Sequence, residues 1–257
     1  MNPNQTQEFS KQVVLVTGGA AGIGEATARA FAARGARVIV SDVQEDAGGR
    51  VAMQIRESGA QAEFIRCDVS DQQQVVKLFD QIRRVYGRLD VAFNNAGIEG
   101  TPAPVGDSSL ENWKRTLDIN LNGPYYCMRE EIPMMLAQGG GVIVNCASIA
   151  GIRGFAGMPA YVASKHGLIG LTRNAALDYA AQGIRINAVC PGVIETPMIE
   201  RFTHGSKEAY AGLKGQEPVG RLGRPEEIAD AVMWLARPGA AFVNGAEIAV
   251  DGGWCAK

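Results

Sequence analysis

The chain alternates short runs rich in β-branched residues with longer segments in which apolar residues recur at helical spacing. Short apolar runs predict buried strands, and a period of 3.6 residues predicts amphipathic helices. The predicted strands are residues 12–17, 37–41, 62–66, 89–93, 142–146, 184–189 and 246–250, and the predicted helices are residues 22–34, 45–58, 71–86, 109–138 and 159–182. This alternation is typical of a parallel sheet with helices on its faces.

No linker, repeat or block of charge divides this pattern, and the Gly- and Pro-rich stretches at 97–106 and 149–159 are short enough to be loops. We therefore predict a single α/β domain, a doubly wound parallel sheet (Rossmann fold), over residues 11–257, after a flexible N-terminal segment at 1–10. Such sheets bind ligands beyond the carboxyl ends of their strands. The residues just after each strand are therefore the candidates for function.

Composition narrows the class of partner. The 25 basic and 27 acidic residues leave a formal net charge of -2, which favours neither nucleic acid nor a membrane surface as a partner. Five scattered cysteines without a C-x-x-C pair indicate buried thiols, and His166 and His204 match no metal-ligand spacing, so no metal is expected. The N-terminus lacks a signal-peptide core and no stretch is long and apolar enough to span a bilayer. We expect a cytoplasmic protein that acts on a small molecule.

A glycine-rich turn, TGGAAGIG at 17–24, follows the first predicted strand and opens the first predicted helix. Its glycines let the backbone approach a pyrophosphate, and the helix amino terminus favours negative charge. Glycine also serves such turns for geometry alone, and the spacing is G-x-x-x-G-x-G rather than G-x-G-x-x-G. The position between a strand and a helix is what favours nucleotide binding.

Asp42 ends the second predicted strand, where an acid accepts hydrogen bonds from the adenosine ribose hydroxyls. Its charge would repel the 2′-phosphate of NADP, and the neighbouring Ala21 and Val43 are not basic. We therefore predict NAD as the cofactor. The alternative is that Asp42 is only a solvated loop residue.

Polar and small residues also follow the next two strands. Asp68-Val69 comes after the third strand and Asn94-Asn95-Ala96-Gly97 after the fourth. Asp68 is a candidate hydrogen-bond acceptor for the adenine amine, and the small residues of the second group leave room for adenine and ribose. Because Asp, Asn and Gly are also ordinary turn residues, each signal is weak alone.

Tyr161 and Lys165 are four residues apart in a predicted helix, so both side chains emerge on one face. An ammonium about 4 Å from the phenol would stabilise the phenolate by roughly 4 kcal/mol, which lowers the tyrosine pKa by about three units. The pair would then exchange protons near neutral pH. The spacing is common on exposed helices, but Ser148, just after the fifth strand, adds a hydroxyl that can orient a carbonyl oxygen.

In the order and spacing of its motifs the chain resembles the short-chain dehydrogenase/reductase family over essentially its whole length. The matching positions are 17–24, Asp68, Asn94–Gly97, Asn120, Ser148, Tyr161, Lys165 and Pro191-Gly192. The predicted catalytic residues are Asn120, Ser148, Tyr161 and Lys165. The predicted cofactor-binding residues are Gly18, Ala21, Gly22, Ile23, Gly24, Asp42, Val43, Asp68, Val69, Asn95, Ala96, Gly97, Tyr161, Lys165, Pro191, Gly192, Val193 and Thr196.

The resemblance implies a role for each catalytic residue in an NAD-dependent hydride transfer between nicotinamide and a secondary alcohol or ketone. Tyr161 exchanges the proton, Lys165 lowers its pKa and holds the nicotinamide ribose, Ser148 steadies the substrate oxygen, and Asn120 holds a water beside Lys165. Pro191-Gly192 shapes the nicotinamide pocket. The Val193 backbone and the Thr196 side chain contact the carboxamide, and Thr196 also suits a helix cap before Pro197.

The resemblance also implies a substrate lid near 193–215, facing a largely apolar wall at 149–158, and a homotetramer paired through 111–138 and 159–182. Many relatives reduce 3-oxoacyl groups on an acidic carrier protein with NADP, and bind it through basic helices. Here the corresponding positions carry Glu130, Glu131 and Asp178. We therefore expect a free, mainly apolar or cyclic substrate. The alternatives are a reductase of 3-oxoacyl-[acyl-carrier-protein] type and a non-catalytic NAD-binding regulator.

Overall fold

The central strands are apolar along their length and are covered on both faces. β1 (Val13–Thr17) reads VVLVT, and all five of its residues are buried. Its side chains alternate, because Val14 and Val16 pack in one core cluster and Val13 and Leu15 in another. A parallel sheet needs helices on both faces to bury strands of this kind.

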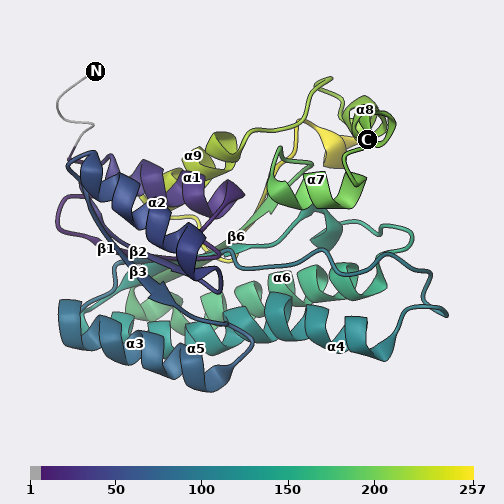
Figure 1. Cartoon of the computed structure of the whole chain (residues 1–257). Helices are drawn as coiled ribbons and strands as arrows, with labels where there is room; N and C mark the ends of the chain where they lie inside the picture. Colours follow the sequence, from purple (N-terminus) through teal and green to yellow (C-terminus); the bar gives the residue numbers. More distant parts are fainter. Residues whose placement is uncertain (1–6) are drawn as a thin grey trace.

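The computed structural model describes residues 7–257, which form seven parallel strands between two layers of helices (Figure 1). The strands are β1, β2 (Arg37–Asp42), β3 (Gln61–Arg66), β4 (Val91–Asn94), β5 (Gly141–Cys146), β6 (Ile184–Pro191) and β7 (Glu247–Val250). Their order in the sheet is β3-β2-β1-β4-β5-β6-β7, and each neighbouring pair is parallel. The predicted single-domain, doubly wound fold is confirmed.

Helices α1, α2 and α9 cover one face of the sheet and α3, α4, α5 and α6 the other (Figure 1). The first group is α1 (Gly22–Ala32), α2 (Glu45–Glu57) and α9 (Pro225–Ala236), and the second is α3 (Gln72–Tyr86), α4 (Leu110–Leu117), α5 (Gly123–Ala137) and α6 (Pro159–Tyr179). Two further helices, α7 (Pro197–Thr203) and α8 (Lys207–Gln216), lie within the segment predicted as a lid.

The helix predicted over 109–138 is divided in the structure. A π-helical turn, Asp118–Asn122, separates α4 from α5, and the Gly123 N–H donates to the Asp118 carbonyl. Pro124 has no N–H to donate to the carbonyl of Asn120, so the regular ladder cannot pass this point. The turn therefore falls at Asn120, a predicted catalytic residue.

Helix α9 was not among the helices predicted from the sequence, although its sequence contains typical features of a helix start. Pro225 stands at its first turn, Glu226 and Glu227 follow where acids favour a helix start, and buried apolar residues recur from Ile228 onward. Among residues 7–257, no helix is long and apolar enough to cross a membrane.

Part of the predicted flexible segment at 1–10 lies outside the described residues, namely 1–6. Residues 7–10 differ from that expectation, because Phe9 is 1% exposed and its ring packs edge-on against Phe31 at 4.8 Å between centroids. The Phe9 N–H also donates to the Arg34 carbonyl. Burial of one aromatic ring orders this turn.

Candidate active site

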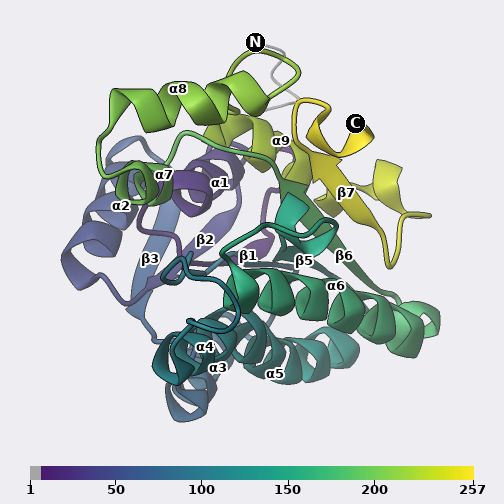
Figure 2. The same ribbon diagram turned by 90° about the vertical axis from the view of Figure 1, so that its right-hand side faces the viewer.

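A cleft of about 1380 Å³ opens at the carboxyl edge of the sheet, near β1 and β4, where the strand order reverses. The loop before α4 and helix α7, whose ribbons appear in Figure 2, both contribute residues to its lining. The predicted cofactor residues that line the cleft are Gly18, Ala21, Gly22, Ile23, Asp42, Val43, Asp68, Val69, Asn95, Ala96, Gly97 and Thr196. Gly24, Asn120, Ser148, Tyr161, Lys165, Pro191, Gly192 and Val193 are not part of its lining.

The glycine-rich turn lines part of the cleft. Gly18 and Gly22 have positive φ angles of 62° and 55°, which favour glycine. A Cβ on Gly24 would lie 2.1 Å from the Gly18 carbonyl oxygen, so only glycine lets α1 start this close to the loop. The N-cap, Ala21, makes no side-chain hydrogen bond to the helix, which leaves the first N–H groups of α1 for an anion. The turn therefore fits a dinucleotide pyrophosphate.

Asn95 braces this turn from β4. Its side-chain amide donates to the Thr17 and Gly18 carbonyls, both at 3.0 Å, and the Thr17 hydroxyl accepts the N–H groups of Asn95 and Ala96 at 3.0 and 3.2 Å. Sequence reasoning placed Asn95 at the cofactor. The structure shows that it also fixes the loop, together with Thr17, whose role was not predicted.

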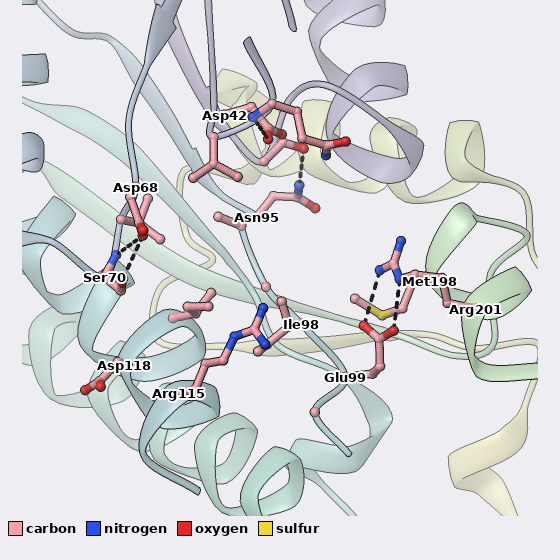
Figure 3. A pocket seen from close by; sticks show the side chains of 18 of the residues that line it. Asp42, Asp68, Ser70, Asn95, Ile98, Glu99, Arg115, Asp118, Met198 and Arg201 are labelled. Atoms are coloured by element: carbon pink, nitrogen blue, oxygen red, sulfur yellow. Dashed lines mark hydrogen bonds and ion pairs between the residues drawn. The ribbon is translucent and has the colours of Figure 1, made fainter. Parts of the chain in front are cut away.

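Asp42 stands at the end of β2 with its carboxylate at the cleft (Figure 3). One oxygen accepts the Ala20 N–H at 3.0 Å and the other the Gln44 N–H at 3.0 Å. Each oxygen keeps a lone pair for a further donor. This arrangement suits ribose hydroxyls and is unfavourable for a phosphate.

Asp68 and Val69 also line the cleft. The Asp68 carboxylate accepts the N–H and the hydroxyl of Ser70 at 3.0 and 2.6 Å (Figure 3). Val69 is buried and packs against Gly123, where a Cβ would approach it to 2.8 Å. Val69 therefore joins this part of the cleft to the start of α5.

Tyr161 and Lys165 occupy the first turns of α6, and Ser148 follows β5 at the start of a 3-10 turn, Ile149–Gly151. Ser148 hydrogen-bonds the Tyr161 hydroxyl, and its oxygen also accepts the Ala150 N–H at 3.0 Å. The Lys165 ammonium lies 5.6 Å from the Tyr161 ring centroid. The predicted serine, tyrosine and lysine therefore come together.

Asn120 and Lys165 meet the cleft at Gly97. A Cβ on Gly97 would lie 3.3 Å from Asn120 Oδ1 and 3.5 Å from Lys165 Nζ, so both polar atoms border this lining residue. Asn120 is fully buried, and its side-chain amide pairs with Ile98, accepting the N–H and donating to the carbonyl at 2.8 Å each. Its amide also donates to the Ser164 hydroxyl at 3.2 Å.

The expected lowering of the Tyr161 pKa by Lys165 is not found. Burial raises the pKa of Tyr161 to about 12, although the Ser148 hydrogen bond acts in the opposite direction. The Lys165 ammonium donates to the Cys146 carbonyl at 2.7 Å. Burial also lowers the pKa of Lys165. At neutral pH Tyr161 is therefore a protonated acid.

Pro191 is the last residue of β6, and Gly192 and Val193 follow it. Gly192 and Val193 line a separate pocket of about 100 Å³. The Val193 N–H donates to the buried Glu217 carboxylate at 3.2 Å, so this N–H is already engaged. Thr196 stands at the N-cap position of α7, yet its hydroxyl donates to the Ile194 carbonyl and makes no capping bond.

Sequence reasoning missed an ion pair in the cleft. Glu99, in the loop after β4, and Arg201, on α7, both line it and point toward each other (Figure 3). Arg201 Nε lies 3.1 Å from one Glu99 oxygen and Nη2 lies 3.3 Å from the other. No local motif signals this pair, because its members are far apart in the chain.

A doubly wound sheet with a dinucleotide turn and a serine–tyrosine–lysine group at its carboxyl edge defines a nicotinamide-dependent oxidoreductase. A family model described as "Enoyl-(Acyl carrier protein) reductase" matches residues 18–255. The chain is 41% identical over 257 residues to a cyclohexanol dehydrogenase of Acinetobacter sp. (strain SE19), with 100% of each covered. It belongs to the short-chain dehydrogenase/reductase family.

Two solved structures resemble the chain throughout. The crystal structure of levodione reductase has a TM-score of 0.94 and 37% sequence identity, covering 96% of this chain and 99% of that one. A structure from Beutenbergia cavernae, described as an NAD(P)-dependent gluconate 5-dehydrogenase with bound NADP, has a TM-score of 0.92 and 34% identity, covering 97% and 99%. The chain is thus an enzyme that transfers a hydride between nicotinamide and a secondary alcohol or ketone.

Proposed function

We propose that this enzyme is an NAD-dependent dehydrogenase of free, mainly apolar, cyclic secondary alcohols, which also reduces the matching ketones. One observation carries the proposal. Ser148, Tyr161 and Lys165 come together, and the Lys165 ammonium borders Gly97, which lines the same cleft as Asp42. The resemblance to a cyclohexanol dehydrogenase supports a ring as the substrate.

The glycine-rich turn would hold the pyrophosphate, Asp42 the adenosine ribose and Asp68 the adenine. When bound, the nicotinamide supplies the site that accepts or gives the hydride. The Asp42 carboxylate supports NAD over NADP, because a 2′-phosphate beside it would be repelled. Arg37 begins β2 and lies at the other end of that strand, so it offers no compensating charge.

Tyr161 exchanges the proton at the substrate oxygen. Because its pKa is about 12, the phenol is protonated at neutral pH and ready to donate to a ketone oxygen. In alcohol oxidation the same phenol oxygen accepts the proton, so the rate of oxidation rises with pH below that pKa. Ser148 steadies the substrate oxygen by donating its hydroxyl proton.

A reductase acting on carrier-linked 3-oxoacyl groups is the weaker candidate, although the matching family model is described by such a reaction. Of the acidic residues first weighed against it, Glu131 is buried and does not contribute to the surface. Glu130 is exposed in part and pairs with Arg83, and Asp178 is exposed on α6. The remaining surface still offers no basic site at these positions for an acidic carrier.

We also propose a cytoplasmic homotetramer with a lid formed by α7 and α8, residues 197–216. Support for the assembly comes from exposed apolar side chains on α4, α5 and α6. They are Leu110, Trp113, Tyr125, Leu136 and Leu177.

The proposed reaction is tested by NADH formation from cyclohexanol. Tyr161→Phe should lower kcat by at least about a hundredfold, because the proton acceptor is removed. Tyr179→Phe, at the other end of the same helix, is the matched control and should stay near the activity of the unaltered enzyme. Equal activity of Tyr161→Phe and the unaltered enzyme would refute the mechanism.

Cofactor choice is tested at Asp42. Asp42→Ala should raise the kcat/KM ratio of NADP to NAD by about tenfold or more, because it removes both the repulsion and the ribose acceptor. The measurement is initial rates with each cofactor at fixed alcohol concentration. An unchanged ratio would remove the role assigned to Asp42.

A further inference from the structure

The ion pair between Glu99 and Arg201 brings together two separate parts of the cleft lining. Glu99 belongs to the loop between β4 and α4, and Arg201 belongs to α7. Both side chains line the cleft and point toward each other (Figure 3). The guanidinium reaches both carboxylate oxygens, Nε to one at 3.1 Å and Nη2 to the other at 3.3 Å, which is a two-pronged arrangement. A carboxylate of the chain itself therefore occupies this guanidinium.

The loop 97–99 places the pair close to the predicted catalytic residues. A Cβ on Gly97 would lie 3.5 Å from Lys165 Nζ and 3.3 Å from Asn120 Oδ1, and Gly97 also lines the cleft. The side chain of Asn120 holds the next residue, Ile98, through both its N–H and its carbonyl at 2.8 Å each. Glu99 comes next, and a span of two residues is at most about 7 Å long. The backbone that carries the carboxylate is therefore fixed beside the reaction centre.

Apolar side chains flank the ion pair. Ile98 precedes Glu99 in the loop, and Met198 lies three residues before Arg201 on α7, so Met198 and Arg201 share one helix face. Both Ile98 and Met198 line the cleft (Figure 3). A hydrocarbon ring finds apolar surface there, while a charged substituent on that ring would meet the ion pair. The charge of the substituent should therefore affect binding.

A substrate carboxylate would meet a neutralised cation and a like charge at this place. Glu99 already pairs with both guanidinium nitrogens that face it, and its own charge repels a second carboxylate. The segment 111–118 adds two acidic and two basic side chains to the cleft lining, so its contribution has no net charge. These side chains are Glu111, Asp118, Lys114 and Arg115. Within the described lining, the charges nearest to loop 97–99 thus disfavour an anionic substrate.

We propose that Glu99 and Arg201 determine which substrate charge the enzyme accepts: Glu99 occupies the guanidinium of Arg201 and thereby selects neutral cyclic alcohols over those that carry a carboxylate. The pair acts by excluding the wrong ligand, which is an established way to obtain specificity. Without Glu99, Arg201 would bind a substrate carboxylate in the same two-pronged geometry. This inference rests on the proposed function, because it concerns the cyclic alcohol that the same site takes.

The test compares 4-hydroxycyclohexanecarboxylate with cyclohexanol, two alcohols that share a ring and differ in the carboxylate. The quantity measured is the ratio of their kcat/KM values with NAD at saturation. Glu99→Gln keeps the size of the side chain but removes its charge and frees the guanidinium, so it should raise the ratio by about tenfold or more. Arg201→Gln leaves the Glu99 carboxylate without its counter-charge, so it should lower the ratio by about threefold or more.

A second measurement does not depend on turnover. Calorimetric titration of the enzyme with bound NADH gives the Kd of cyclohexanecarboxylate and the Kd of its neutral analogue, cyclohexanecarboxamide. The unaltered enzyme should bind the amide more tightly than the carboxylate. Glu99→Gln should reverse this preference, and Arg201→Gln should increase it, because the two variants change the charge at this place in opposite directions.

Arg88→Gln is the matched control for both measurements. Arg88 pairs with both carboxylate oxygens of Asp90, just before β4, and the two side chains have similar exposures to those of the cleft pair, 53% and 14%. Neither residue is part of the cleft lining. Loss of this ion pair should therefore change neither the ratio of kcat/KM values nor the preference for the amide.

Opposite changes in the two variants, in turnover and in binding, would support the selection by charge. Changes in the same direction, or no change in Glu99→Gln, overturn it, because loss of a merely structural contact would affect both variants alike. An unaltered enzyme that binds the carboxylate more tightly than the amide overturns it as well. If the unaltered enzyme fails to oxidise cyclohexanol while the binding preferences follow the expected order, the proposed substrate is wrong and the selection by charge stands.

Discussion

Burial changes the protonation state of the Glu131 side chain. Glu131 is fully buried on α5, and burial raises its pKa to about 8, while a hydrogen bond from Asn94 at 3.2 Å partly opposes the shift. Within residues 7–257, Glu131 Oε1 and Asn94 Oδ1 have no hydrogen-bond partner. A neutral, protonated Glu131 fits this environment better than a carboxylate.

This protonation predicts a pH-dependent stability. The folded-state pKa of Glu131 lies above the value of 4.5 for an exposed glutamate. The free energy of unfolding is therefore highest below pH 4.5, and it falls as the pH rises toward 8. The loss amounts to at most about 5 kcal/mol. Glu131→Gln cannot ionise, so its free energy of unfolding should gain on that of the unaltered enzyme between pH 5 and pH 8.

Urea unfolding at several pH values measures this difference. Glu130→Gln is the control, because the Glu130 side chain is partly exposed and pairs with Arg83. The difference in free energy of unfolding between Glu130→Gln and the unaltered enzyme should vary much less with pH. If the difference in free energy of unfolding between Glu131→Gln and the unaltered enzyme is constant from pH 5 to 8, Glu131 is already ionised in the folded protein over this range.

At the scale of elements, hydrogen bonds tie the parts that carry the site. The Asn94 amide on β4 donates to Asn145 on β5 at 3.0 Å, and the Asn145 amide donates to Thr172 on α6 at 2.9 Å. The Asn94 amide also donates to Glu131 on α5. These hydrogen bonds join β4 and β5, which precede Asn95 and Ser148, to α6, which carries Tyr161 and Lys165. The relative positions of the catalytic groups therefore depend on buried contacts behind them.

The C-terminal residues tie two further segments. Trp254 stacks on Phe155, in the predicted substrate wall, at 4.9 Å with 17° between the rings. Arg153 in the same loop donates to the Cys255 carbonyl at 3.1 Å, and Lys257 donates to the carbonyl of Gln216, at the end of α8, at 2.6 Å. The C-terminal segment 251–257 thus connects the substrate wall to the lid.

Trp254→Ala should destabilise the protein by about 1–2 kcal/mol, since it removes the stacking and its buried area. It should also raise KM for cyclohexanol more than KM for NAD, because the wall at 149–158 loses its support. Trp254→Phe keeps an aromatic ring, so it should retain most of the stability and most of the affinity for cyclohexanol. Parallel increases in both KM values would show a general loss of structure instead.

At the scale of the whole molecule, the exposed apolar residues predict assembly. Leu177 on α6 is 84% exposed, and Leu110 and Trp113 on α4 are exposed as well. Light scattering should give four times the chain mass of 27.3 kDa. Leu177→Glu should give smaller species if α6 lies in an interface, whereas Val85→Glu, also at an exposed site but on α3, should not.

A monomer in light scattering would reject the tetramer. A tetramer that Leu177→Glu leaves intact would keep the assembly but place its interfaces away from this part of α6.

Local patterns in the sequence determined the sheet and most of the helices, and they pointed to the glycine-rich turn and to the predicted catalytic residues. Hydrophobic periodicity sets strand and helix, and motif spacing places Gly18, Ser148 and Tyr161 at strand ends or on one helix face. The residues at the start of helix α9 also indicated a helix there. These features depend on residues close to each other in the chain.

Only the tertiary structure decided what depends on burial and on distant contacts. Glu130 and Glu131 are adjacent and alike in sequence, yet one is partly exposed and the other is buried and raised in pKa. The Tyr161 pKa moves up rather than down, because burial of the phenol outweighs the opposing hydrogen bond from Ser148. The pair formed by Glu99 and Arg201 spans 102 positions of the chain, and only the folding of α7 against the cleft brings its two charges together.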